Sequence, residues 1–121
     1  MAINEDYRQL EIVQELEAQA RTLAHSTRTV PNPPDSYDML AELGAALSAL
    51  EQVARQLGRW HREVIDGDHY QGEDERGDGA TGTIEAAAAL DRAATALHAA
   101  SAAVSDAHSA NGVVRWIGTN A

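Results

Sequence analysis

Carboxylates gather in one short segment of this chain, DGDHYQGEDERGDGATG, at residues 66–82. Carboxylate oxygens are the ligands that Ca²⁺ prefers, so a cation site here would use four acidic residues: Asp66, Asp68, Asp74 and Glu75. The spacing does not fit an EF-hand loop. With Asp66 at the first position, the sharp-turn glycine would fall at Gln71 and the closing acid at Gly77. We expect no resident metal and keep a cation-binding module as an alternative.

The composition of the same segment is also typical of a flexible turn. Its backbone is freed by five glycines: Gly67, Gly72, Gly77, Gly79 and Gly82. The tripeptide at residues 76–78, Arg-Gly-Asp, matches an adhesion motif, but three residues match by chance too often to carry a function. We therefore expect residues 67–82 to form an acidic, glycine-rich loop, with His69 and Tyr70 as its anchors.

No other segment carries the pattern of an enzyme. Cysteine is absent, which excludes disulfides and thiolate metal sites. The sequence contains no nucleophile elbow and no phosphate-binding glycine loop followed by Lys. His61 and His108 fall on predicted apolar seams, where a histidine is more often structural than a ligand. We expect no catalytic residues and no cofactor.

Size and charge narrow the remaining functions. The 121 residues are enough for one domain, residues 1–121, with a modest core. The formal net charge is −10, so the molecule as a whole repels nucleic-acid backbones, and we expect no direct nucleic-acid binding. The first residues lack a signal-peptide pattern, and no apolar run approaches the roughly 20 residues of a membrane span. We expect a protein of the cytoplasm, or of an assembled particle, with no membrane contact.

The apolar periodicity predicts three helices, at about residues 3–27, 36–66 and 83–110. Three prolines at residues 31–34 separate the first two, because proline is not tolerated inside a helix. Asp35 or Ser36 is a suitable N-cap for the second helix and Thr83 for the third. Asn111-Gly112 is a suitable stop, and residues 111–121 form an apolar tail.

The second predicted helix carries a seam of coiled-coil type over about four heptads. Its apolar positions alternate steps of three and four: Leu40, Leu43, Leu47, Leu50, Ala54, Leu57, His61 and Val64. Trp60 lies on the flank of this seam, and Arg55, Arg59 and Arg62 lie on another face, where we expect them to pair with the acidic first helix. Glu51 is placed to support Arg55, because residues four apart are neighbours on a helix.

The third predicted helix carries two seams, about 100° apart around its axis. One contains Ala87, Leu90, Ala94, Leu97, Ser101, Val104 and His108. The other is entirely alanine: Ala86, Ala89, Ala93, Ala96, Ala100, Ala103, Ala107 and Ala110. Small residues permit close approach of a neighbour, so we expect this helix to be contacted on both faces.

These elements predict an all-α fold, an elongated antiparallel three-helix bundle. A long hairpin centred on residues 67–82 would place His61 beside residues 87–88 and Leu40 beside His108. The N-terminal helix would dock alongside this hairpin.

The function that fits this fold is a non-enzymatic helical interaction or structural assembly protein. It would bind a protein partner or a second copy of itself, as a small component of a phage or mobile element would. The alternative is an acidic inhibitor or DNA mimic that occupies a basic site on a nucleic-acid enzyme. The expected interface residues are the two Trp residues, the alanine seam and the tail: Trp60, Ala89, Ala93, Ala96, Ala100, Ala103, Val113, Val114, Trp116 and Ile117.

Overall fold

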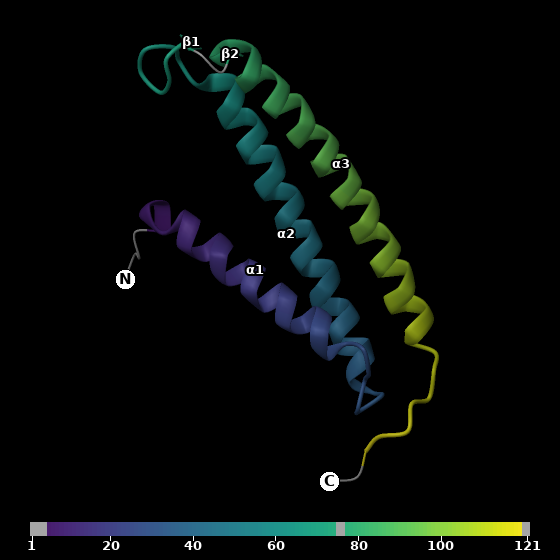
Figure 1. The fold of residues 1–121 in the computed structure, drawn as a ribbon. Helices are drawn as coiled ribbons and strands as arrows, with labels where there is room; N and C mark the ends of the chain where they lie inside the picture. Colours follow the sequence, from purple (N-terminus) through teal and green to yellow (C-terminus); the bar gives the residue numbers. More distant parts are fainter. Residues whose placement is uncertain (1–4, 75–76, 120–121) are drawn as a thin grey trace. The chain divides into compact units, whose positions relative to one another are not determined.

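A computed structural model describes residues 5–74 and 77–119 and confirms the all-α class. Three helices account for most of the chain, and two two-residue strands pair with each other in the loop between the second and third helices (Figure 1). In chain order the elements are a 3₁₀ turn (Glu5–Tyr7), α1 (Gln9–Ser26), α2 (Asp35–Glu63), β1 (Glu73–Asp74), β2 (Gly77–Asp78) and α3 (Gly79–Asn111). None of the helices in the described part of the chain is long and apolar enough to cross a membrane.

The chain divides into two compact units. The hairpin unit comprises residues 36–115 and contains nearly all of α2 and the whole of α3. The terminal unit comprises residues 1–35 and 116–121 and contains α1. Docking of the first helix alongside the hairpin stays a prediction.

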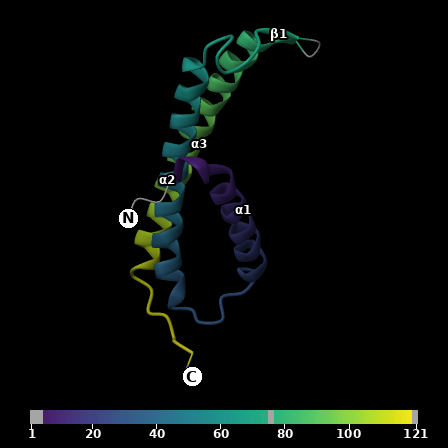
Figure 2. The ribbon, with the colours of Figure 1, turned by 90° about the vertical axis from the view of Figure 1, so that its left-hand side faces the viewer.

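In the hairpin unit, α2 and α3 lie side by side and run antiparallel (Figures 1 and 2). Near one end, the Tyr37 and His108 rings stack with their centroids 4.1 Å apart. Further along, the hydroxyl oxygens of Ser48 and Ser101 lie 2.9 Å apart. Leu40 and His61 therefore sit at opposite ends of the hairpin, and the predicted register is confirmed.

The interface between the two helices is built from very small residues. The buried apolar side chains in the described residues are Ala54, Ala87 and Ala94, and Gly58 is buried beside them. A Cβ at Gly58 would lie 3.5 Å from the carbonyl oxygen of Ala87 and 3.1 Å from the Asp91 carboxylate. The α3 backbone thus lies in contact distance of a Cβ at position 58, and the Asp91 carboxylate would have to shift slightly to admit one.

This close approach corrects the predicted seam of α2. Six of the eight predicted residues are buried or half-buried as expected: Leu40, Leu47, Leu50, Ala54, His61 and Val64. The other two, Leu43 and Leu57, are 41% and 45% exposed. Gly58 is buried at the interface where the prediction placed its neighbour Leu57, because a leucine at this point would hold the two helices farther apart. On α3, every residue of the predicted mixed seam is buried or half-buried.

The helix ends next to the loop differ from the prediction. The second helix ends at Glu63 rather than at residue 66, and the third begins at Gly79 rather than at Thr83. The reason for the early start is Asp78, whose carboxylate accepts hydrogen bonds from the Ala80 backbone N–H and from a nearby hydroxyl. The stop at Asn111, with Gly112 as the C-cap, is confirmed.

The terminal unit holds α1 and the end of the tail. The first helix begins at Gln9 rather than at residue 3 and is preceded by the 3₁₀ turn. The end of the tail pairs with the proline segment: the Thr119 backbone N–H donates to Asn32 (3.0 Å) and its hydroxyl donates to the Pro31 carbonyl (2.7 Å). The tail thus contacts its own chain at this point.

Candidate interaction surface

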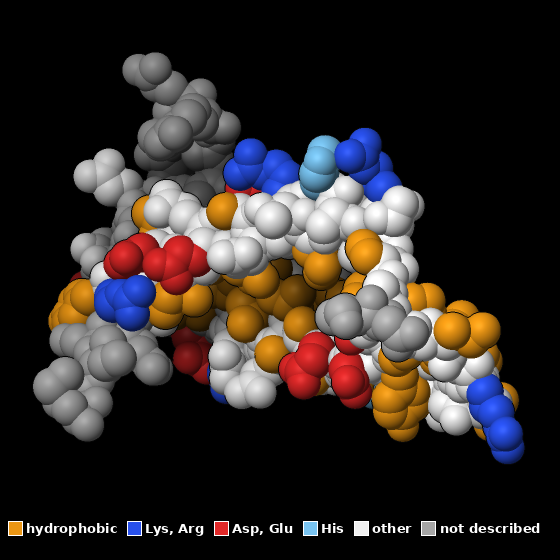
Figure 3. Space-filling model, turned by 90° about the horizontal axis from the view of Figure 1, so that it is seen from below, with side chains coloured by type: hydrophobic (Ala, Val, Ile, Leu, Met, Phe, Trp, Pro, Cys, Tyr) orange, Lys and Arg blue, Asp and Glu red, His pale blue; other side chains and the backbone are white. Residues whose placement is uncertain are grey.

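Several large apolar side chains of α2 lie outside the α2–α3 interface. Val53 is 42% exposed, Leu57 45% and Trp60 52%. They belong to a stripe with steps of three and four residues: Leu43, Ala46, Leu50, Val53, Leu57 and Trp60. Such spacing is typical of a helix face that packs against another helix. Figure 3 shows apolar side chains, in orange, reaching the molecular surface beside charged ones.

Polar contacts across the hairpin show on which side this stripe lies. Glu51 accepts a hydrogen bond from the His98 ring (3.1 Å), and Arg62 forms an ion pair with Asp91. Leu50 precedes Glu51 by one residue, so it lies about 100° back around α2. The leucine stripe therefore runs along the opposite side of the interface from these polar contacts.

The same offset holds on α3. Leu97 precedes His98, and Leu90 precedes Asp91, so both leucines lie about 100° back from the polar contacts. Because the polar residues of the two helices meet on one side, the leucines of both helices share the other side. We call this surface the apolar face; its residues are Leu43, Ala46, Leu50, Val53, Leu57 and Trp60 on α2 and Ala86, Leu90, Ala93, Leu97, Ala100 and Val104 on α3.

The two edges of the apolar face carry side chains of different size. The α2 edge presents leucine, valine and tryptophan, whereas the α3 edge beyond its half-buried leucines presents alanine. Ala93 is exposed and Ala100 half-buried. We call the α2 edge, with its larger side chains, the tall edge and the alanine edge on α3 the low edge.

The structure brings together some of the predicted interface residues. Trp60, Ala93 and Ala100 share the apolar face, while three other alanines lie farther around α3 and are exposed: Ala89, Ala96 and Ala103. The predicted tail residues are exposed as well: Val113 (85%), Val114 (45%), Trp116 (43%) and Ile117 (85%). Of these four, Trp116 and Ile117 belong to the terminal unit and Val113 and Val114 to the hairpin unit.

The polar side of the hairpin is held by charge-assisted contacts. Glu51 accepts from the Arg55 guanidinium (2.8 Å), as predicted, and from His98. These hydrogen bonds, that of Arg55 first, hold the pKa of Glu51 below its ordinary value of 4.5. Arg55 and Arg62 both pair inside the hairpin. Pairing of these arginines with the first helix stays a prediction. The His98 contact was missed, although the predicted register places residue 98 opposite residue 51.

The acidic loop is organised around its anchors. The His69 Nδ1 accepts a hydrogen bond from the Ile65 backbone N–H (2.9 Å), and Tyr70 packs against Gly79. The hydrogen bonds from the Thr81 hydroxyl and the Ala80 backbone lower the pKa of Asp78, whose carboxylate caps α3. The described part of the loop is therefore held in place by these contacts, and His69 and Tyr70 act as the anchors that the sequence predicted.

Of the proposed cation ligands, Asp66 and Asp68 are exposed. The Asp74 side chain and Glu75 lie outside the described part of the chain. Within residues 5–74 and 77–119, no three His, Asp or Glu side chains are placed to hold a metal ion.

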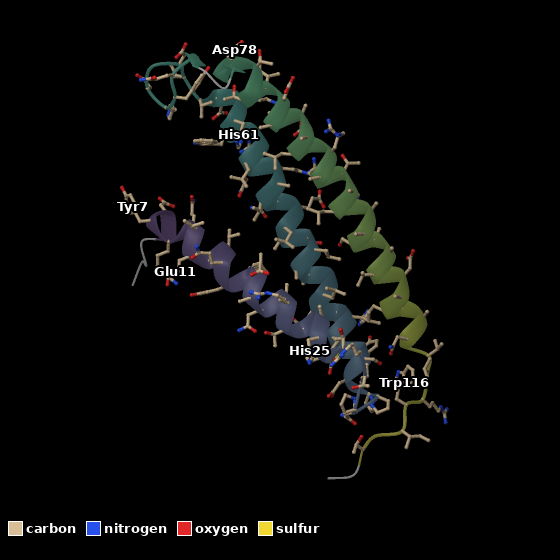
Figure 4. The ribbon with its side chains drawn as sticks, viewed as in Figure 1. Tyr7, Glu11, His25, His61, Asp78 and Trp116 are labelled. Carbon is tan, nitrogen blue, oxygen red and sulfur yellow. The ribbon has the colours of Figure 1, made fainter. Side chains whose placement is uncertain are left out.

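A recess of about 560 Å³ opens beside the loop, where α2 ends and α3 begins. Figure 4 shows His61 and Asp78 near this end of the hairpin. The His61 Nδ1 lies 2.6 Å from the Leu57 carbonyl oxygen, and the Thr83 hydroxyl donates to the Ala80 carbonyl. The described lining residues are His61, Tyr70, Gln71, Gly79, Gly82, Thr83 and Ala86. They include no carboxylate to orient the histidine, so they do not form an acid–base or nucleophile constellation.

The apolar face is therefore the most distinctive surface of the described chain. Comparison with protein-family models, with curated proteins and with solved structures finds no match to this chain.

Proposed function

We propose that this protein is a non-enzymatic interaction protein, in which the α2–α3 hairpin joins protein chains in an assembly. The observation that supports the proposal most strongly is the apolar face. Monomeric soluble proteins rarely leave large contiguous apolar patches uncovered, and such patches commonly mark protein–protein contacts. Here Leu57 and Trp60 stay about half exposed, while the fully buried residues in the described part of the hairpin are alanines and a glycine.

Trp60 is the natural anchor of the contact. Its ring meets the His61 ring edge-on, with centroids 4.9 Å apart, and the His69 ring with centroids 6.4 Å apart. These contacts fix the indole on the surface without covering it. A positioned, half-exposed tryptophan is the type of residue that contributes most to binding free energy at interfaces.

The acidic inhibitor has less support. Such a protein needs unpaired acids arrayed on one face, and on the polar side of the hairpin Glu51 and Asp91 do not provide them, because both are paired with arginines. On α1, Glu17 is also paired, with Arg21 at 2.8 Å.

The proposal is tested by the stability of Val53→Ala and Trp60→Ala in highly dilute protein. If these side chains serve binding, each variant unfolds with a free energy within about 0.5 kcal/mol of the wild type, as surface substitutions do. Urea denaturation followed by circular dichroism measures this. A loss of about 3 kcal/mol or more for Trp60→Ala would place the side chain in the core of the single chain and contradict the proposal.

A further inference from the structure

The shape of the apolar face identifies its occupant. We infer that the face binds a second copy of this chain, and this inference rests on the proposed function. In the dimer, α2 of each copy lies along the alanine edge of the other copy's α3. The face has a tall edge on α2 and a low edge on α3. A rotation of 180° about an axis parallel to the helices sets the tall edge of each copy over the low edge of the other.

This arrangement is a closed, isologous dimer, the commonest symmetry of soluble oligomers. Each α2 then faces an antiparallel α3, as it already does within its own hairpin. With the hairpin register kept, Leu57 of one copy comes level with Ala93 of the second copy, and Leu50 with Ala100. At these two levels a large side chain meets a small one, which favours close helix packing.

The dimensions of the face suit a dimer. From Leu43 to Trp60 it spans about 26 Å of helix, and two adjacent helices are about 20 Å wide, so each copy presents roughly 500 Å². The total is about 1,000 Å², the lower bound for a specific interface between proteins. The contact is also continuous with the hairpin interface, because Leu50, Leu90 and Leu97 are half-buried at its edge.

The first helix of the same chain is the competing occupant, and its length argues against it. It has 18 residues, against 29 in α2. An antiparallel α1 that starts level with the first turn of α2 would end about 27 Å along it, near Val53. The 3₁₀ turn before it would add about 6 Å, to about the level of Leu57. Trp60, the most exposed side chain of the stripe, would stay uncovered.

The test is the solution mass of the full chain by light scattering after gel filtration. The dimer predicts twice the 12.9 kDa of one chain. The double variant Leu57→Gln/Trp60→Gln removes the tall edge, and Ala93→Leu raises the low edge; each weakens dimerisation at least tenfold. Ala99→Leu adds the same volume at an exposed position on the other side of α3 and leaves the dimer intact. Circular dichroism of each variant confirms that the helices remain.

Acrylamide quenching separates the other outcomes, in a Trp116→Phe background where Trp60 is the single indole. A dimer with shielded Trp60 supports the inference. A monomer with exposed Trp60 overturns the second copy as occupant but leaves the proposed interaction function standing. A monomer with shielded Trp60 means that the chain covers the face itself, and this result overturns both. A dimer that the Leu57/Trp60 and Ala93 variants do not weaken forms through another surface and also overturns the inference.

Discussion

The two faces that α2 presents have opposite compositions. Toward α3 it presents glycine and alanine at its closest contacts, and these positions are buried. On the apolar face it presents Leu43, Val53, Leu57 and Trp60, and each of these side chains is more than 40% exposed. In most small domains the largest apolar residues lie inside, because they bury the most area. The hairpin thus brings its helices together through small residues and leaves several of its largest apolar side chains exposed.

The largest loss of stability is expected from a larger side chain on the buried face, between α2 and α3. Ala94 is fully buried between the helices, so Ala94→Leu forces α2 and α3 apart. We expect a loss of about 3 kcal/mol of unfolding free energy, at the upper end of ordinary overpacking costs. Thermal and urea denaturation measure the change, with exposed Ala99→Leu as the control. Equal stability of the two variants would show that the helices do not meet at Ala94.

A smaller effect is expected at the loop end of the hairpin, where Asp78 sharpens the boundary of α3. Asp78→Ala removes the side chain that accepts from the Ala80 N–H and the Thr81 hydroxyl. N-cap losses of this kind cost about 1 kcal/mol. Asp78→Asn, which keeps a capping oxygen, should recover most of the stability. If the alanine variant unfolds like the wild type, the cap does not set the helix start.

The smallest effect is expected on the polar side of the interface, and it depends on pH. The folded-state pKa of Glu51 lies below its ordinary value of 4.5, so its contribution to stability is present above pH 4.5 and is lost as the pH falls through the lowered pKa. Glu51→Gln should therefore flatten the acid limb of the stability curve below about pH 4.5. Urea melts between pH 2 and pH 7 measure this limb. An unchanged acid limb would mean that the Arg55 and His98 contacts do not favour the carboxylate.

Much of the fold followed from the sequence. The three helices, the proline break and the hairpin register could be predicted because apolar period, proline and the Asn-Gly stop act locally. The mixed seam of α3 was predicted correctly for the same reason. The helix starts were less predictable. Asp78 and Thr83 are both acceptable caps, and only the hydrogen bonds in the folded loop decide between them.

The candidate surface was harder to predict from the sequence. The leucine period of α2 marks a helix face correctly, but it does not say which of two adjacent stripes meets α3. That choice depends on how closely the helices approach, and Gly58 with Ala94 decides it. Trp60, Ala93 and Ala100 were all predicted as interface residues, but the sequence did not show that they share one face; the Glu51–His98 and Arg62–Asp91 contacts on the opposite side place them there.

Two neighbouring positions test the central claim most directly. Leu57 faces outward and Gly58 faces α3, so their sizes are the reverse of their burial. We would measure the unfolding free energy of Leu57→Ala and Gly58→Leu in dilute protein. The account predicts a change within about 0.5 kcal/mol for Leu57→Ala and a loss of about 3 kcal/mol for Gly58→Leu. The opposite order, with Leu57→Ala the more damaging variant, would show that the leucine stripe is the core of the single chain and would contradict the account.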